Sequence, residues 1–189
     1  MRRPFFSVFQ VLLSLGPILA ACAPGHGLPP LADQGSRDYR LGSGDTVRII
    51  TYGEDPLTGE FKVNDQGDVT LPLAGRVAAA GKTPTQLGEA IAGSLRKGAV
   101  LVNPSVSVEI ATYRPIFVLG EVNKPGQYPY QPGMTMVTAA AVAGGFTYRA
   151  VDGYASVVRT VDGESVEGIV SRQAFVQPGD VITVFERRF

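Results

Sequence analysis

The feature that most constrains this sequence is residues 118–147 (VLGEVNKPGQYPYQPGMTMVTAAAVAGGFT), where signals for two strands, a tight turn and a helix follow one another. Apolar residues run without a break over 116–119 (IFVL), which predicts a strand buried on both faces. Lys124, Pro125 and Gly126 then supply turn chemistry, because proline fixes φ and the glycine accepts the positive φ of a type II turn. The chain is therefore expected to reverse direction at this turn.

A short alanine-rich helix is expected to follow this hairpin. Thr135 is placed to cap its N-terminus, and Gly144 with Gly145 would end it in the left-handed conformation open to glycine. Further along, residues 154–160 and 165–170 predict a hairpin around a turn at 162–163, and residues 176–185 a closing segment that ends in a strand. Together these elements predict a second, sheet-containing unit, with the boundary before it near residues 112–115.

The first half of the chain predicts a small sheet with one helix. The start of the helix carries clear signals: Thr83 as N-cap, Pro84 at the first position and Gln86 completing a capping box. Leu87, Ile91 and Leu95 are expected to form its buried stripe, and Gly98 is expected to end it. Strands are expected over residues 46–52, 61–63, 69–73 and 106–110, with a hairpin turn at 65–68 joining the second to the third.

The N-terminus has the pattern of a secretory signal. Arg2 and Arg3 precede a mostly apolar run over residues 5–21 that is too short and too interrupted for a standard membrane span. Residues 19–22 (LAAC) resemble the bacterial lipobox, which implies cleavage between Ala21 and Cys22 and acylation of the Cys22 thiol. An uncleaved inner-membrane anchor is the alternative.

Cys22 is the only cysteine in the chain, so it has no intrachain disulfide partner. Acylation would explain why a single cysteine is present. Two or more acyl chains hold a protein durably on a membrane, whereas one holds it only marginally. Ala23 rather than an aspartate follows the cysteine, and by resemblance this favours the outer membrane. Residues 22–37, rich in Gly and Pro, are expected to form a flexible tether in which His26 is solvated.

Composition excludes several classes of function. Lys and Arg together number 17, as do Asp and Glu, and loss of Arg2 and Arg3 with the signal leaves a net charge of about −2, which argues against a nucleic-acid partner. The single histidine and the committed cysteine leave no nucleophilic triad and no His/Cys metal site, and no phosphate-binding loop is present, so neither a metal nor a cofactor is expected.

Paired carboxylates for sugar hydrolysis are the one enzyme alternative. Most of the candidates follow a glycine at a strand entrance, where a side chain that accepts backbone hydrogen bonds is the simpler explanation, and we expect no catalysis; the candidates are Asp45, Asp68, Glu121 and Asp180. Asp45 and Asp180 lie in two segments with the same spacing of apolar residues around a Gly-Asp pair, LGSGDTVRI at 41–49 and VQPGDVITV at 176–184. This internal echo could arise from turn chemistry alone.

Two longer motifs resemble known families. Residues 120–145 (GEVNKPGQYPYQPGMTMVTAAAVAGG) are similar to the SLBB repeat, a soluble ligand-binding β-grasp unit. The upstream YRLGSGDTVRI and DQGDVTLPLAGRVAAAGKT resemble the export motif of the bacterial polysaccharide biosynthesis/export family. The resemblance implies an α+β fold with this order: signal peptide 1–21, tether 22–37, a small mixed-sheet export domain over 38–112 and an SLBB domain over 113–189.

The same resemblance implies a non-enzymatic lipoprotein of the outer membrane that faces the periplasm and carries extracellular or capsular polysaccharide. We expect a homo-oligomeric ring. The candidate surface for subunit or ligand contacts consists of Gly120, Glu121, Lys124, Pro125, Gly126, Tyr128 and Tyr130, although each could equally be a turn or core residue of a monomer.

Partners follow from a departure from the family pattern. Members that perforate the outer membrane carry a long C-terminal amphipathic helix, whereas residues 186–189 (ERRF) end this sequence after one SLBB unit. We therefore expect it to rely on a separate outer-membrane pore or on an inner-membrane polysaccharide copolymerase. The alternative function is a monomeric carbohydrate-binding lipoprotein with stacking platforms among Tyr128, Tyr130, Phe146 and Tyr148.

Overall fold

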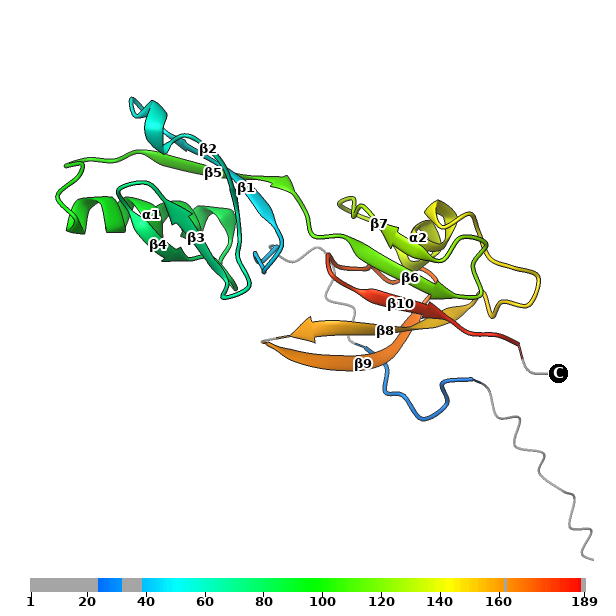
Figure 1. Cartoon of the computed structure of the whole chain (residues 1–189). Coiled ribbons are helices and arrows are strands. Elements are labelled where there is room, and N and C mark those ends of the chain that lie inside the picture. Colours follow the sequence, from blue (N-terminus) through cyan, green and yellow to red (C-terminus); the bar gives the residue numbers. More distant parts are fainter. Residues whose placement is uncertain (1–23, 32–38, 162, 188–189) are drawn as a thin grey trace, which may run out of the picture.

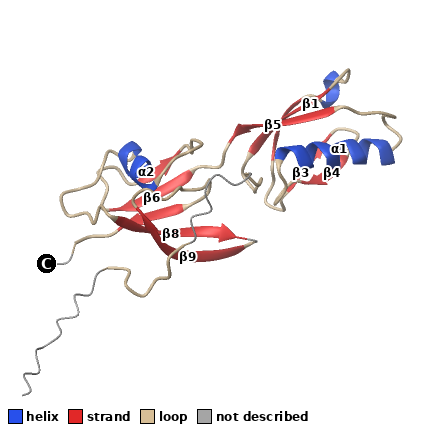
Figure 2. Cartoon of the chain, turned by 180° about the vertical axis from the view of Figure 1, so that it is seen from behind, coloured by secondary structure: helices blue, strands red, loops and turns tan. Residues whose placement is uncertain are grey.

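The computed structural model describes residues 24–31, 39–161 and 163–187, arranged as two sheet-and-helix units side by side (Figures 1 and 2). The leader and the cleavage and acylation residues Ala21 and Cys22 lie outside the described residues. No helix in the described ranges is both long and apolar enough to span a membrane. The first unit contains elements β1 to β5 and α1, and the second unit contains β6 to β10 and α2.

The first unit is built on a three-stranded antiparallel sheet. The strand order is β2 (Gly59–Lys62), β1 (Thr46–Thr51), β5 (Val106–Thr112). Helix α1 (Pro84–Lys97) packs on one face of this sheet, and the remaining elements are the short helix η1 (Asp55–Leu57) and the hairpin β3 (Asp68–Leu71) and β4 (Gly75–Ala78). The core forms where Val47 and Ile49 of β1 meet the α1 stripe Leu87, Ile91 and Leu95, all fully buried.

Helix α1 confirms its sequence prediction at both ends. The Thr83 side chain accepts from the Gln86 backbone N–H, and the Gln86 side chain accepts from the Thr83 N–H, which completes the capping box. Gly98 is the C-cap, as expected, with a φ of −75°. The left-handed residue is Ala99, with a φ of 52°.

The hairpin expected between residues 61–63 and 69–73 is wrong in its pairing. The chain does turn there, because the Asn64 side chain accepts from the backbone N–H groups of Gln66 and Asp68. However, β2 pairs with β1, whereas β3 pairs with β4, a strand that the sequence analysis missed. Pro72 lies in the turn between β3 and β4 and not within an edge strand.

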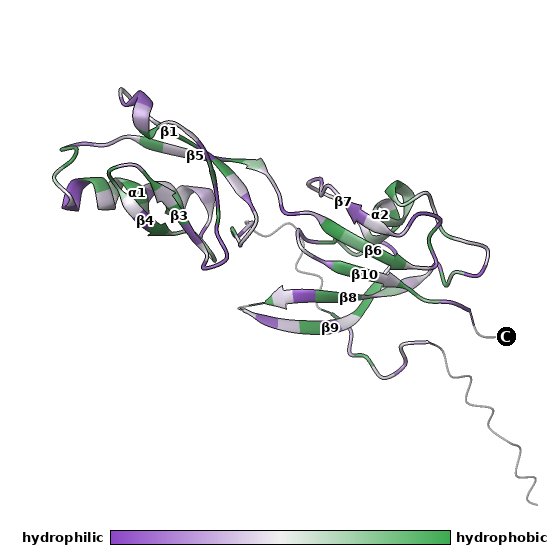
Figure 3. Ribbon diagram, viewed as in Figure 1, coloured by the Kyte–Doolittle hydropathy of each residue, from purple (hydrophilic) through white to green (hydrophobic). Residues whose placement is uncertain are grey.

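The second unit has a five-stranded mixed sheet with helix α2 (Met136–Val142) on one face. The strand order is β7 (Gly126–Tyr128), β6 (Ile116–Gly120), β10 (Val181–Val184), β8 (Tyr154–Val161), β9 (Glu164–Ser171). Strands β6 and β10 are parallel and the other pairs antiparallel. Apolar segments along β6 and β10 meet α2 in the second core (Figure 3). The α+β class is confirmed, and so is the capping of α2 by Thr135 and its left-handed ending at Gly144 and Gly145.

Two expectations for the stretch around β6 are wrong. Strand β6 is buried on one face only, since Phe117 and Leu119 are 38% and 42% exposed and no described helix covers their side of the sheet. Gly126 does not adopt a positive φ; the left-handed residue is Gly120, with a φ of 79°. The reversal itself is confirmed, because β6 and β7 pair in antiparallel register.

Residues 24–31 differ from the flexible tether that we expected. They lie along β9, where the Leu31 N–H donates to the Ile169 carbonyl at 2.8 Å and the Ile169 N–H donates to the Pro29 carbonyl at 2.8 Å. The Tyr154 hydroxyl donates to the Pro24 carbonyl at 3.0 Å. We call residues 24–31 the strap, because they cover the outer edge of β9 that would otherwise be open.

Gly168→Val is expected to release the strap while leaving β9 in place. A Cβ at Gly168 would lie 2.7 Å from the Pro29 carbonyl oxygen, too close for the present contact. Loss of the two strap hydrogen bonds should cost about 1–2 kcal/mol. Amide hydrogen exchange at Leu31 and Ile169 should accelerate, whereas Gly153→Ala, which adds a Cβ into open space, should leave both amides protected. Unchanged protection in Gly168→Val would contradict the strap.

Candidate functional site

The turn over residues 120–126 is anchored to the C-terminal end of α2. The Lys124 N–H donates to the Ala143 carbonyl at 2.8 Å, and the Asn123 N–H donates to the Gly145 carbonyl at 3.0 Å. The first of these bonds satisfies the carbonyl of the C-cap residue of α2, which the helix itself leaves without a partner. The backbone of Glu121 accepts from Thr147, whose hydroxyl also donates to the Glu121 carboxylate. Lys124 and Pro125 remain exposed on the surface of this turn.

The aromatic side chains after this turn are mostly part of the core. Tyr128, Tyr130 and Phe146 are half-buried and pack against the second core, and the Tyr128 hydroxyl donates to the Lys124 carbonyl. Only Tyr148 is freely displayed, at 89% exposure. The structure therefore does not assemble these four rings into one open stacking platform.

A ladder of three tyrosines, which the sequence analysis did not find, joins the two units. Tyr113 lies between Tyr39 and Tyr130, with ring centroids 5.1 Å and 5.3 Å away and edge-to-face geometry on both sides. Burial, and then the hydrogen bond to Asp45, raises the pKa of the Tyr39 phenol. Burial raises the pKa of Tyr130 as well, with the nearby Tyr113 adding to it. Both phenols therefore stay protonated at neutral pH.

Asp45 and Asp180 occupy equivalent turns, which gives the internal sequence echo a structural basis. The Gly42 N–H donates to the Asp45 carboxylate at 2.8 Å, and the Gln177 N–H donates to the Asp180 carboxylate at 2.7 Å. In both turns the aspartate N–H returns a bond to the carbonyl of that same residue, at 3.1 Å. The prediction that these carboxylates accept backbone hydrogen bonds is confirmed for both. The Asp68 backbone N–H, by contrast, is itself bonded to the Asn64 side chain.

Arg114 connects the two equivalent turns. Its backbone N–H donates to the Asp45 carboxylate at 2.9 Å, and its side-chain Nε donates to the Pro178 carbonyl at 2.8 Å. A Cβ at Gly42 or at Gly179 would collide with the Arg114 side chain, so these glycines make room for it. We call Arg114, Asp45 and the tyrosine ladder the joint, because they hold the first unit against the second.

Arg114→Ala is expected to loosen the joint without unfolding either unit. The variant loses the bond to Pro178 and the cation 4.0 Å from Asp45, but it keeps the backbone bond to that carboxylate. Because the side chain is partly exposed, the cost should be about 1–2 kcal/mol. Proteolysis within residues 112–115 should become faster, and Arg76→Ala on the exposed β4 serves as the matched control. Equal cleavage rates in the two variants would contradict this role.

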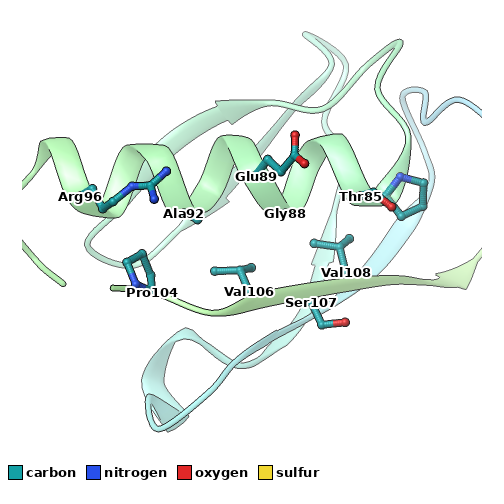
Figure 4. Close-up of a pocket in the computed structure, with 10 residues that line it drawn as sticks. Thr85, Gly88, Glu89, Ala92, Arg96, Pro104, Val106, Ser107 and Val108 are labelled. Carbon is teal, nitrogen blue, oxygen red and sulfur yellow. The ribbon is translucent and has the colours of Figure 1, made fainter. Parts of the chain in front are cut away.

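A groove of about 400 Å³ lies in the first unit between α1 and β5 (Figure 4). Its floor is apolar, with Val106 and Val108 facing the small residues Gly88 and Ala92, while Glu89 and Arg96 stand at the rim. A Cβ at Gly88 would come within 3.1 Å of the Val106 carbonyl, so the helix lies close to the strand at that point. Strand β5 is at the edge of its sheet, which leaves the groove beside an unpaired edge.

Comparison with known proteins places both units. The family model described as polysaccharide biosynthesis/export protein matches residues 33–111, and the SLBB domain model matches residues 115–170. The chain contains a domain of the polysaccharide biosynthesis/export family followed by an SLBB domain. Its first unit is the export domain, and its second unit is the SLBB domain, as the sequence motifs predicted.

The chain is similar to parts of longer named proteins. It is 33% identical to the exopolysaccharide production protein ExoF of Rhizobium meliloti, over 82% of this chain and 39% of that protein. It is 28% identical to the EPS I polysaccharide export outer membrane protein EpsA of Ralstonia nicotianae, over 80% of this chain and 42% of that protein. The polysialic acid transport protein KpsD of Escherichia coli is 29% identical over 57% of this chain and 20% of its own length. The chain thus spans about two fifths of the length of the first two relatives.

Proposed function

We propose that this chain is a lipid-anchored, periplasm-facing component of a complex that exports extracellular or capsular polysaccharide. The observation that carries the proposal is the tandem of an export domain and an SLBB domain in one chain. Relatives named for exopolysaccharide production, polysaccharide export and polysialic acid transport support the same class of cargo. The chain contributes surfaces for assembly and performs no catalysis.

The buried carboxylates support a structural role. Asp45 and Asp180 are both 0% exposed, and each already accepts several hydrogen bonds from the protein. A glycosidase needs two carboxyl groups that face the scissile bond of a sugar. These two side chains face protein partners, so they hold turns and strands together.

The strap supports an anchoring role for Cys22. Pro24 lies two positions after Cys22, which limits the distance between the two residues to about 7 Å. Because Pro24 contacts Tyr154 of the SLBB domain, acyl chains on Cys22 would hold that domain next to the membrane. The export domain would then extend toward partners in the periplasm or the inner membrane.

Exposed apolar loops of the export domain offer a contact surface for such a partner. Tyr52, Leu73 and Val102 are 87%, 70% and 86% exposed. The Tyr52 N–H donates to the Ser105 carbonyl, so the loop of Tyr52 lies beside the segment that follows Val102. The loop of Leu73 is held by α1, whose Ser94 hydroxyl donates to the Ala74 carbonyl. Leu73 is also left-handed, with a φ of 62°, a strained conformation for leucine. These loops fit an inner-membrane copolymerase or a separate outer-membrane pore as the partner.

Cys22→Ser is expected to move the protein from the membrane fraction to the soluble periplasmic fraction, because the hydroxyl replaces the thiol that receives lipid. Fractionation of cells that express the variant measures this directly. We expect secreted polymer to fall at least about tenfold, since loss of the tether removes the high local concentration at the membrane. A variant that stays in the membrane fraction would contradict the anchor.

Deletion of the gene separates export from the alternative of a monomeric carbohydrate-binding lipoprotein. For an export component, secreted polymer should disappear and polymer or its precursors should accumulate inside the cell. For a binder, secretion should continue and only surface retention should change. Restoration by the wild-type gene, assayed beside Cys22→Ser, controls for effects on neighbouring genes.

A further inference from the structure

The sheet of the export domain has two open edges that run in the same direction. Strands β2 and β5 both pair with β1 in antiparallel fashion, so they are parallel to each other. Within the described residues, neither outer edge has a ladder partner. Open edges of this kind are templates for pairing with another chain. A rotation that brings one copy's β2 beside another copy's β5 would therefore create a parallel pair.

From this geometry, we propose that β2 of one copy adds to the β5 edge of the next copy, so that export domains join head to tail. The proposal rests on the proposed export function and on the homo-oligomeric ring that the family resemblance implies, and it names the surfaces that would build that ring. A contact between two different surfaces of the same chain closes into a ring when the rotation between neighbours is a simple fraction of a turn. In this arrangement, the groove between α1 and β5 receives the Phe61 side chain from the neighbour's β2.

Charge selects the register of this added strand. On the sheet face away from α1, β5 presents Ser107, Glu109 and Ala111, and β2 presents Glu60 and Lys62. One register places Lys62 of the neighbour beside Glu109, and the next register that keeps the faces aligned places Glu60 beside it instead. Opposite charges on adjacent strands stabilise a sheet and like charges destabilise it. The register with Lys62 beside Glu109 is therefore favoured.

The same register places an aromatic ring at the groove. With Lys62 beside Glu109, the neighbour's Phe61 stands beside Val108 on the face that packs against α1. Phe61 is only half-buried within its own copy. The groove offers the apolar floor and the small α1 residues Gly88 and Ala92 that such a ring requires. Charge pairing on one face and an apolar fit on the other thus agree on one register.

Charge reversal with rescue tests the contact on the full acylated chain in detergent. Lys62→Glu and Glu109→Lys should each weaken self-association by about tenfold, because each places like charges side by side. The double variant K62E/E109K recreates an opposite pair and should return to within about threefold of the wild type. All of these positions are exposed, so the protomers should remain folded. Glu164→Lys at the exposed start of β9 is the matched control.

A second variant tests the groove without changing charge. Ala92→Phe would fill the space over Val106 and Val108 and should abolish association while leaving the thermal melt of the protomer nearly unchanged. Sedimentation velocity over a range of concentrations measures each variant.

The outcomes separate this inference from the proposed function. A wild-type protein that associates, single reversals that weaken it and a double variant that recovers would support the edge contact. Association that is equally strong in Lys62→Glu, Glu109→Lys and Glu164→Lys would overturn the contact and leave the ring intact. A wild-type chain that stays monomeric at every concentration would overturn both.

Discussion

Asp180→Ala is expected to lower the free energy of unfolding of the SLBB domain by about 3–5 kcal/mol. The Asp180 carboxylate receives two hydrogen bonds from the Arg159 guanidinium, at 2.9 Å and 2.7 Å. The two side chains are 1% and 4% exposed, so water does not replace the lost partner. Removal of the carboxylate leaves Arg159 charged and unpaired inside the domain, and it also frees the Gln177 N–H.

Urea denaturation of the variant measures this loss. The exposed ion pair between Asp152 and Arg172 provides the control, and Asp152→Ala should cost no more than about 1 kcal/mol. The double variant D180A/R159M removes both charges and should be more stable than Asp180→Ala alone. If Asp180→Ala cost no more than Asp152→Ala, the buried pair would not hold the sheet as described.

Gly120→Ala is expected to destabilise the SLBB domain by about 2–5 kcal/mol, because two costs add. Gly120 has a φ of 79°, which alanine rarely adopts, and its Cβ would lie only 2.1 Å from the Val184 carbonyl oxygen. That oxygen belongs to β10, so the clash would push β6 and β10 apart at their parallel ladder.

Gly126→Ala is the matched control at the other end of the same turn. Gly126 has no positive φ, and the nearest atom to a Cβ there belongs to the Tyr128 ring, 3.9 Å away. Thermal melts of the two variants should therefore differ widely, with Gly126→Ala within about 1 kcal/mol of the wild type. Similar melting temperatures would refute the close approach of Gly120 to β10.

The sequence predicted elements whose signals are local. Helix α1 could be placed from Thr83, Pro84 and Gln86, since a capping box is made by residues three apart. The helix α2, the β8–β9 hairpin and the β6–β7 reversal were found for the same reason. The two family motifs predicted the order of the domains, which the family comparison matches.

Features made by residues far apart in the chain escaped prediction. Arg114 meets Pro178, and the strap meets β9, across sequence separations that no periodicity reports. The exposed face of β6 was missed because its apolar run resembles a strand covered on both sides. The Gly-Asp echo was visible, but only the matching hydrogen bonds of Asp45 and Asp180 give it structural meaning.

The contact surface predicted at the turn over residues 120–126 remains a proposal. The structure shows which of its residues are exposed enough to contact a partner. Lys124 and Pro125 are open to a partner, whereas Gly120 is needed for packing against β10. Tyr130 contributes to the joint through Tyr113. Subunit contacts at this turn would therefore involve its tip, and a loss of assembly in Gly120 variants would reflect the fold of the domain.

Native mass spectrometry of the acylated chain, extracted in detergent, tests whether this chain assembles into an export conduit, because such a conduit requires several copies around one axis. We expect one discrete species at a fixed multiple of the protomer mass, stable on dilution and composed of protomers that carry lipid on Cys22. If the extracted protein were monomeric at every concentration, and the cells it came from still secreted their polymer, the chain would not form an export conduit.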